Sequence, residues 1–252
     1  MIMKSSEDRI SEKTPSLKET EAVYNDSIWR NKMSSEDYST LERRWRSRWD
    51  FAKTHIPHNS LVLDVGCGDG ILGEFLIKES SCKVYGVDIS SIALGLARTK
   101  GLVTRLCDAS HDAFPFDDEM FDVVVMTCIL EHIALPEHAL KESKRVLRHG
   151  GLIVITIPNV ANIKNRLGFL LGRMPSEFLH MKAGIHIRFW NYSDEFERHI
   201  LCDFKELKVI KKIATLKNPK ASSRLKRGIL ESLIKISPNL FGEYTHFLIE
   251  RI

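Results

Sequence analysis

Three glycines separated by single residues, Gly66, Gly68 and Gly70, directly follow the apolar segment 61–65. Glycine adopts left-handed backbone angles at little steric cost and lets a ligand approach the main chain closely. Asp88 ends the next apolar segment about twenty residues later, where a carboxylate can accept hydrogen bonds from both hydroxyl groups of a ribose. These residue types at this spacing predict a site for a cofactor that contains a ribose.

The same stretch also holds the pattern GDGILG, which is the Gly-x-Gly-x-x-Gly of a dinucleotide-binding loop when it is read from Gly68. In such a loop the first glycine follows the strand directly, and the expected strand ends at Val65. Counted from Gly66, the third glycine position is occupied by Ile71, so the strand boundary favours the Gly-x-Gly-x-Gly register. We therefore expect Gly73 to be a close-packing position on a helix, and an NAD(P)-dependent oxidoreductase to be the weaker alternative.

The elements that position these residues alternate along the chain from residue 61 onward. Short apolar runs rich in β-branched residues predict buried strands, and apolar residues at spacings of three and four predict helices. The strands are expected at 61–65, 83–88, 103–108, 121–127 and 152–158, and the helices at 70–80, after 90 and at 136–148. This alternation predicts an α/β fold with a doubly wound, Rossmann-like, mostly parallel sheet. Two later segments, 204–214 and 244–252, predict an antiparallel C-terminal edge strand.

Three regions are expected along the chain. Residues 1–17 are polar and mixed in charge, and they predict a disordered tail. Residues 18–58 predict a helical extension or lid, and residues 59–252 predict the main domain, with an insertion on the substrate side at 159–203. The helix of the extension would carry an apolar face formed by Tyr38, Leu41, Trp45, Trp49 and Ala52.

The composition excludes several classes of protein. Of the 252 residues, 43% are hydrophobic and 28% are charged, which is typical of a globular protein. The sequence shows no apolar signal segment, no run of ~18 apolar residues and no Cys-x-x-Cys pair among its five cysteines, so a cytoplasmic location is expected. The net charge of +4 is mild, and no Asn-Pro-Pro-Tyr-like motif follows the segment 121–127, so DNA is not expected as a partner.

Five motifs follow one another along residues 61–160: LDVGCGDG, VYGVDIS, CDA, FDVVVMTCILEHI and RVLRHGGLIVITIPN. In this order they resemble the class I S-adenosylmethionine-dependent methyltransferases, in the broad group that acts on small molecules. The resemblance is looser over HIRFWNYSDEF. It implies S-adenosylmethionine as the cofactor, S-adenosylhomocysteine as the product, and methyl transfer to a small-molecule acceptor, most readily at oxygen.

The resemblance also implies roles for residues around the glycine loop. Asp64 would hold the loop through its amides, and Gly66, Gly68 and Gly70 would admit the methionine part of the cofactor. Asp88 would bind the ribose hydroxyls.

Residues after the second, third and fourth strands would contact the rest of the cofactor. By the same resemblance, Ile89 and Ala109 would pack on the adenine ring, and Asp108 would accept a hydrogen bond from its amino group. The backbone carbonyl of Thr127 would face the ammonium group of the cofactor.

His132 is the candidate proton acceptor for the reaction, because it follows the fourth strand by about one turn and an imidazole titrates near neutral pH. A histidine that only packs or caps this segment is the alternative. Some relatives hold a divalent metal here with an acid, a glutamate and a histidine. This chain has Glu131 and His132, but Cys128 and Ile129 precede them, so no metal site is predicted.

The stretch 223–237 has apolar residues on one side and basic residues elsewhere. Such a stretch is typical of an edge helix that buries one face, and it is also typical of peripheral contact with a membrane or a lipid-linked substrate. For the chain as a whole, a non-catalytic partner subunit that keeps the cofactor site is a further alternative to an enzyme.

Overall fold

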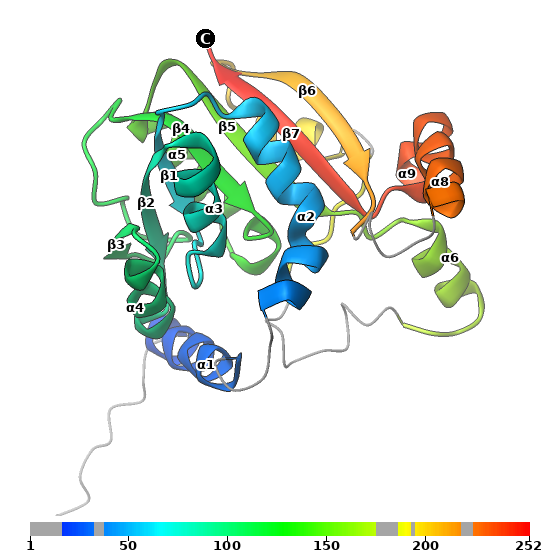
Figure 1. Ribbon diagram of the computed structural model, residues 1–252, viewed down its shortest axis with the longest axis horizontal. Coiled ribbons are helices and arrows are strands. Elements are labelled where there is room, and N and C mark those ends of the chain that lie inside the picture. Colours follow the sequence, from blue (N-terminus) through cyan, green and yellow to red (C-terminus); the bar gives the residue numbers. More distant parts are fainter. Residues whose placement is uncertain (1–16, 33–37, 175–185, 193–194, 218–223) are drawn as a thin grey trace, which may run out of the picture.

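The computed structural model describes residues 17–32, 38–174, 186–192, 195–217 and 224–252. Its centre is a seven-stranded sheet in the order β3-β2-β1-β4-β5-β7-β6, with helices on both faces (Figure 1). The strands are β1 (Leu61–Val65), β2 (Lys83–Asp88), β3 (Val103–Leu106), β4 (Phe121–Thr127), β5 (Leu147–Pro158), β6 (Leu207–Thr215) and β7 (Tyr244–Arg251). The helices are α1 (Leu17–Lys32), α2 (Tyr38–His55), α3 (Ile71–Ser80), α4 (Ser91–Thr99), α5 (Pro136–Val146), α6 (Ile163–Leu170), α8 (Arg224–Ile236) and α9 (Pro238–Phe241). A 3-10 turn, Leu130–His132, follows β4, and a π-helical turn, Glu197–Leu201, precedes β6.

The first five strands run parallel, and the direction of their connections reverses between β1 and β4. Such a reversal opens a crevice outside the carboxyl ends of the strands, where open α/β sheets bind ligands. β7 runs antiparallel to β5, and β6 runs antiparallel to β7 and forms the outer edge. The predicted Rossmann-like, mostly parallel sheet with an antiparallel strand from the C-terminal part of the chain is confirmed.

The apolar runs form strands because both faces of the sheet are covered. Val62, Leu63 and Val124, in the middle of the sheet, are fully buried. One core includes residues of α5, and the other includes residues of α2, α3 and α4. Trp49 of α2 is only 2% exposed and stacks on Phe75 of α3, with ring centroids 5.2 Å apart. The predicted apolar face of α2 therefore packs on the domain at Trp49.

Several predicted boundaries are wrong, and two of them concern a helix end and a strand end. The helix expected to reach Arg148 ends at Val146, because the chain becomes extended at Leu147 and pairs with β4. The strand expected to reach Asp108 ends at Leu106. Asp108 therefore lies in the turn that follows β3, at the carboxyl edge of the sheet.

The two N-terminal helices cover different parts of the domain (Figure 1). α1 packs against α4, whereas α2 packs against α3 and β7. The predicted tail, residues 1–17, lies outside the described residues except for Leu17, and the other predicted domain limits stay predictions. None of the described helices has the length and apolarity needed to span a membrane, and all five cysteines are free thiols.

Candidate active site

The glycine loop joins β1 to α3 at the carboxyl edge of the sheet. Gly66, Gly68 and Gly70 have φ angles of 71°, 54° and 77°, in the left-handed region that favours glycine. A Cβ atom at Gly66 would lie 2.5 Å from a side-chain carbon of Ile129, and one at Gly70 would lie 2.7 Å from the Cα atom of Ala97. Backbone angle and lack of space both require glycine at these positions, so the predicted register of the loop agrees with its geometry.

Asp88 ends β2 and fastens the glycine loop. Its two carboxylate oxygens accept hydrogen bonds from the amides of Gly68 and Ser90, each at 2.9 Å. Burial raises the pKa of this carboxyl group, and backbone hydrogen bonds from Ser90, Gly68 and Ile89 partly oppose that rise. Each carboxylate oxygen has two lone pairs, so the group can still accept hydrogen bonds from a ligand. The glycine loop and the Asp88 carboxylate are therefore joined at the carboxyl edge of the sheet, and their contacts with a cofactor stay predictions.

Asp64 does not hold the loop in the way that the sequence predicted. The amides of Gly66 and Cys67 donate to the Val87 carbonyl at 2.8 and 3.0 Å, and the Gly70 amide donates to the Cys67 carbonyl at 2.9 Å. The Gly68 amide donates to Asp88 instead. Asp88 therefore takes the fastening role that was predicted for Asp64.

The Asp64 carboxyl group is buried at the end of β1. Burial, followed by the nearby carboxylates of Asp88 and Asp69, raises its pKa to about 8 from the ordinary value of 3.8. Between these two values the folded chain keeps the Asp64 proton whereas the unfolded chain loses it. Asp64 therefore favours folding less and less as the pH rises through this range.

Asp64→Asn is expected to flatten the dependence of stability on pH, because asparagine carries no proton to lose. From about pH 5 to about pH 8, the free energy of unfolding should fall less in the variant than in the wild type, with a difference of roughly 1–3 kcal/mol. Urea unfolding at the two pH values measures this difference. Equal losses of stability in both proteins would contradict the protonated state of Asp64.

The other predicted cofactor residues lie at the carboxyl ends of neighbouring strands. Ile89 follows β2 and is half-buried, Thr127 ends β4, and Asp108 and the buried Ala109 follow β3. One Asp108 oxygen accepts a hydrogen bond from the Ser110 amide at 2.8 Å and so caps the turn. The sheet brings these residues to one edge, and their contacts with the cofactor stay predictions.

Sequence reasoning missed the part of α1 that lies on this edge of the sheet. The Asp26 carboxylate accepts hydrogen bonds from the Ser90 hydroxyl at 2.5 Å and from the Ser91 hydroxyl at 3.2 Å. The Trp29 ring lies over the loop, since a Cβ atom at Gly68 would be 2.8 Å from it. α1 has no clear apolar face in the sequence, so no local pattern indicates these contacts.

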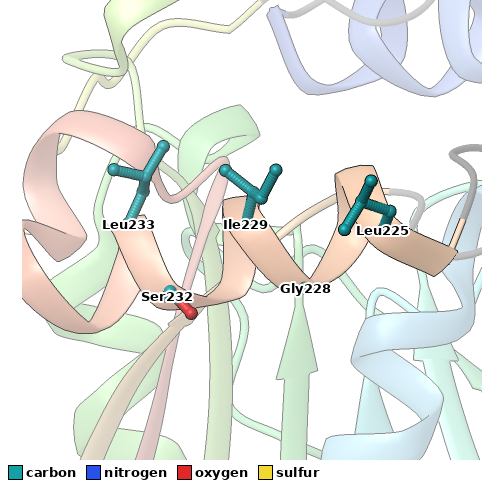
Figure 2. A pocket seen from close by; sticks show the side chains of 5 residues that line it. All are labelled: Leu225, Gly228, Ile229, Ser232 and Leu233. Atoms are coloured by element: carbon teal, nitrogen blue, oxygen red, sulfur yellow. The ribbon is translucent and has the colours of Figure 1, made fainter.

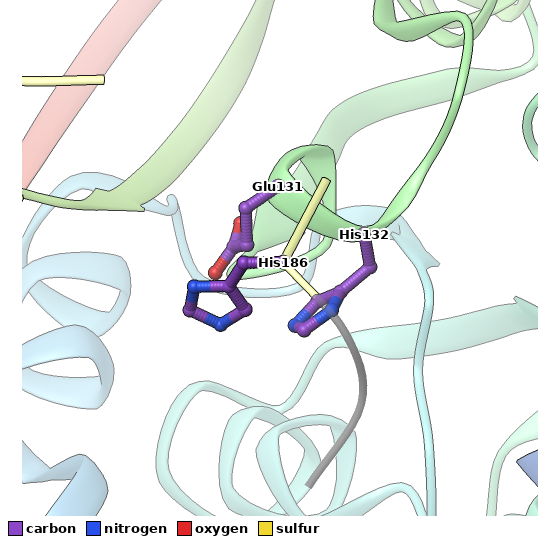
Figure 3. Close-up of side chains that lie close together, drawn as sticks. All are labelled: Glu131, His132 and His186. Carbon is purple, nitrogen blue, oxygen red and sulfur yellow. The ribbon is translucent and has the colours of Figure 1, made fainter. Parts of the chain in front are cut away.

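His132 lies in the 3-10 turn after β4, next to the buried Glu131. The loop contacts this segment directly, because Gly66 lies against Ile129. A third side chain, His186, comes from a distant part of the sequence, and the centroid of its ring lies 4.6 Å from that of His132 (Figure 3).

The basic amphipathic stretch forms α8. Leu225, Ile229 and Leu233 point to one side of the helix, and Ser232 points to the other (Figure 2). Leu225 and Ile229 are 78% and 54% exposed, whereas Ile234 is buried. The helix therefore buries only part of its apolar surface.

A doubly wound sheet with a glycine loop and acidic residues at its carboxyl edge is typical of nucleoside-binding α/β domains. A family model described as a methyltransferase domain matches residues 63–155. The solved structure of a S-adenosylmethionine-dependent methyltransferase from Thermotoga maritima, described as a possible histamine N-methyltransferase, has a TM-score of 0.63 at 19% identity. It covers 90% of this chain and 99% of that one.

Two curated relatives extend the comparison. The ubiquinone biosynthesis O-methyltransferase of Neisseria meningitidis serogroup C is 26% identical over 152 residues, which are 58% of this chain and 62% of that protein. The probable tRNA methyltransferase 9B of Mus musculus is 30% identical over 118 residues, which are 46% of this chain and 25% of that protein. Each match spans less than two thirds of the relative's length. The matched residues 63–155 therefore form a methyltransferase domain, and the chain has the fold of S-adenosylmethionine-dependent methyltransferases.

Proposed function

We propose that this protein transfers the methyl group of S-adenosylmethionine to an oxygen atom of a small molecule. The observation that carries the proposal is the contact between the glycine loop and the segment that bears His132, through Gly66 and Ile129. This contact joins the cofactor loop to a segment with an imidazole and a buried carboxyl group. A methyl acceptor at the same edge of the sheet would then lie between the cofactor and titratable side chains.

The chemistry that the cofactor leaves to the protein supports a role for His132 in methyl transfer. The sulfonium of the cofactor supplies the reactive methyl group, and the protein aligns the acceptor behind it. A hydroxyl acceptor must also lose its proton as the new bond forms. His132 is the side chain proposed to accept that proton.

His132→Ala is expected to lower kcat for methyl transfer by about 100-fold or more, because a positioned base contributes about that much. Affinity for S-adenosylhomocysteine should stay within about two-fold of the wild type, since His132 is not assigned to the cofactor. Turnover with a panel of hydroxylated acceptors and calorimetry with S-adenosylhomocysteine measure the two effects. His58→Ala is the matched control, because His58 is exposed and precedes β1, at the opposite end of the sheet. An unchanged kcat would remove His132 from the mechanism.

The mild net charge of the chain supports a small acceptor rather than a nucleic acid. The two curated relatives are named for ubiquinone biosynthesis and for tRNA, so their names do not distinguish a small molecule from RNA. The net charge of +4 is low for a nucleic-acid-binding protein of 252 residues.

The exposed apolar residues of α8 also support contact with a membrane or a lipid-linked acceptor, which cosedimentation with anionic vesicles would test.

A non-catalytic partner subunit that binds the same cofactor is the competing function. Transfer of a labelled methyl group to any acceptor would exclude it. Tight binding of S-adenosylhomocysteine without turnover across a broad panel of acceptors would favour it over the proposed enzyme.

A further inference from the structure

Three possible metal ligands meet at the edge of the candidate active site. Glu131, His132 and His186 each offer one ligand atom, and these atoms all lie within 4.8 Å of one another. Figure 3 shows the Glu131 carboxylate and the two imidazole rings converging from the 3-10 turn and from the segment around His186. The sequence predicted no metal because Cys128 and Ile129 precede Glu131. The structure supplies a donor from a distant segment instead.

The Glu131 carboxylate points to a missing partner. The residue is 1% exposed, and its Oε2 atom is buried without a hydrogen-bond partner among the described residues. A buried polar atom without a partner costs free energy, so it calls for an explanation such as an ion. The buried Arg48 of α2 interacts electrostatically with Glu131 and balances one negative charge, and the Cys128 side chain forms a hydrogen bond with the same carboxyl group. Oε2 still has no hydrogen-bond partner in the part of the chain that the structure describes.

His186 is held at the cluster by backbone contacts that do not depend on a metal. The amides of Ile187 and Arg188 donate to the Glu131 carbonyl at 2.8 and 3.2 Å. The Arg188 guanidinium also donates to the Ala134 carbonyl at 2.5 Å. These hydrogen bonds join the segment that follows His186 to the segment that contains Glu131. Little main-chain movement is therefore needed to bring the three ligand atoms together.

We propose that Glu131, His132 and His186 form a binding site for a divalent transition-metal ion such as Zn²⁺. One carboxylate and two imidazoles are a ligand set that Zn²⁺ and related ions use in catalytic sites, where one position stays open to water or substrate. Bonds of about 2.1 Å place the ligand atoms of a tetrahedral ion about 3.4 Å apart, so ligand atoms that now lie within 4.8 Å of one another would have to approach by at most about 1.4 Å. Mg²⁺ prefers oxygen ligands and fits this set poorly.

The metal and the proposed base would serve the same step. A bound divalent ion polarises an acceptor hydroxyl and eases the loss of its proton. With the ion bound, His132 would act as its ligand and not as the proton acceptor, and the proton of the acceptor hydroxyl would leave to water. Metal binding can be measured without cofactor or acceptor, so its outcome is independent of whether the chain transfers methyl groups.

The test is titration of the full chain, without an affinity tag and freed of metal by a chelator, with Zn²⁺ and with Co²⁺. We expect one equivalent of Zn²⁺ to bind, and one equivalent of Co²⁺ to give the visible absorption of a cobalt site with nitrogen ligands. Glu131→Gln and His186→Ala should each weaken Zn²⁺ binding by at least about 10-fold. His58→Ala should bind Zn²⁺ like the wild type, and excess Mg²⁺ should not displace the ion.

Two results would overturn the site. One is absence of Zn²⁺ and Co²⁺ binding to the wild type. The other is unchanged binding in both Glu131→Gln and His186→Ala, which would place the ion elsewhere on the protein. Glu131→Gln keeps the size of the buried side chain, and a thermal shift with S-adenosylhomocysteine verifies that each variant is folded.

Discussion

Asp88→Ala is expected to weaken the binding of S-adenosylhomocysteine by about 100-fold or more. The substitution removes the carboxylate proposed to bind the ribose hydroxyls, and hydrogen bonds to a charged group contribute about 1.5–3 kcal/mol each. It also releases the amides of Gly68 and Ser90, which Asp88 holds at 2.9 Å. The ligand would therefore lose its hydrogen bonds and also the ordered loop. Calorimetry on the wild type and the variant measures the loss.

The control for this experiment is Asp117→Ala, because Asp117 is an exposed carboxylate outside the site. Asp88→Asn should fall between the wild type and Asp88→Ala, since one side-chain oxygen remains to accept an amide hydrogen bond. NAD and NADP, tested in parallel, should not stabilise the protein. Stabilisation by a nicotinamide cofactor but not by S-adenosylhomocysteine would contradict the assignment of this loop.

Gly70→Ala is expected to lower the free energy of unfolding by about 3 kcal/mol. The residue has a φ angle of 77°, and a left-handed conformation costs a residue with a side chain about 1–2 kcal/mol. The added Cβ atom would also lie 2.7 Å from the Cα and 2.8 Å from the Cβ atom of Ala97. These are backbone-fixed positions on α4, so the clash adds about 1–3 kcal/mol. Equilibrium unfolding in urea measures the change.

Gly95→Ala is expected to have the opposite effect on stability, in α4, the helix against which Gly70 packs. Gly95 lies inside α4, and a Cβ atom there would meet no described atom within 4 Å. Alanine in a helix interior is more stable than glycine by about 0.5–1 kcal/mol, so this variant should be slightly more stable than the wild type. Equal stability of the Gly70 and Gly95 variants would show that the loop is less constrained than its geometry indicates.

The sequence predicted the strands best where both faces of the sheet are buried. The limits of β1, β2 and β4 agree with the predicted segments, because continuous apolar runs leave little choice about where a central strand begins and ends. The close-packing role of Gly73 is confirmed, since a Cβ atom there would lie 2.6 Å from Leu102. The start of β5 was predicted too late, because Gly150 and Gly151 have the appearance of a helix end.

The parts of the site that the sequence could not predict depend on contacts between distant segments. His186 meets His132 only because backbone hydrogen bonds join its segment to Glu131. Asp26 reaches Ser90 from a helix with no apolar stripe. The role of Asp64 was misjudged for a related reason, because the partners of the loop amides come from β2 and from the loop itself. Local periodicity carries no information about such pairs.

The position of β7 has a consequence for the order in which the protein acquires its structure during synthesis. β7 lies between β5 and β6 and pairs with both of them. β6 leaves the ribosome earlier, but within the described sheet its only neighbour is β7. Until residues 244–251 emerge, the nascent chain therefore exposes two open edges, at β5 and at β6. Both edges are closed together by the last strand of the sheet to be synthesised.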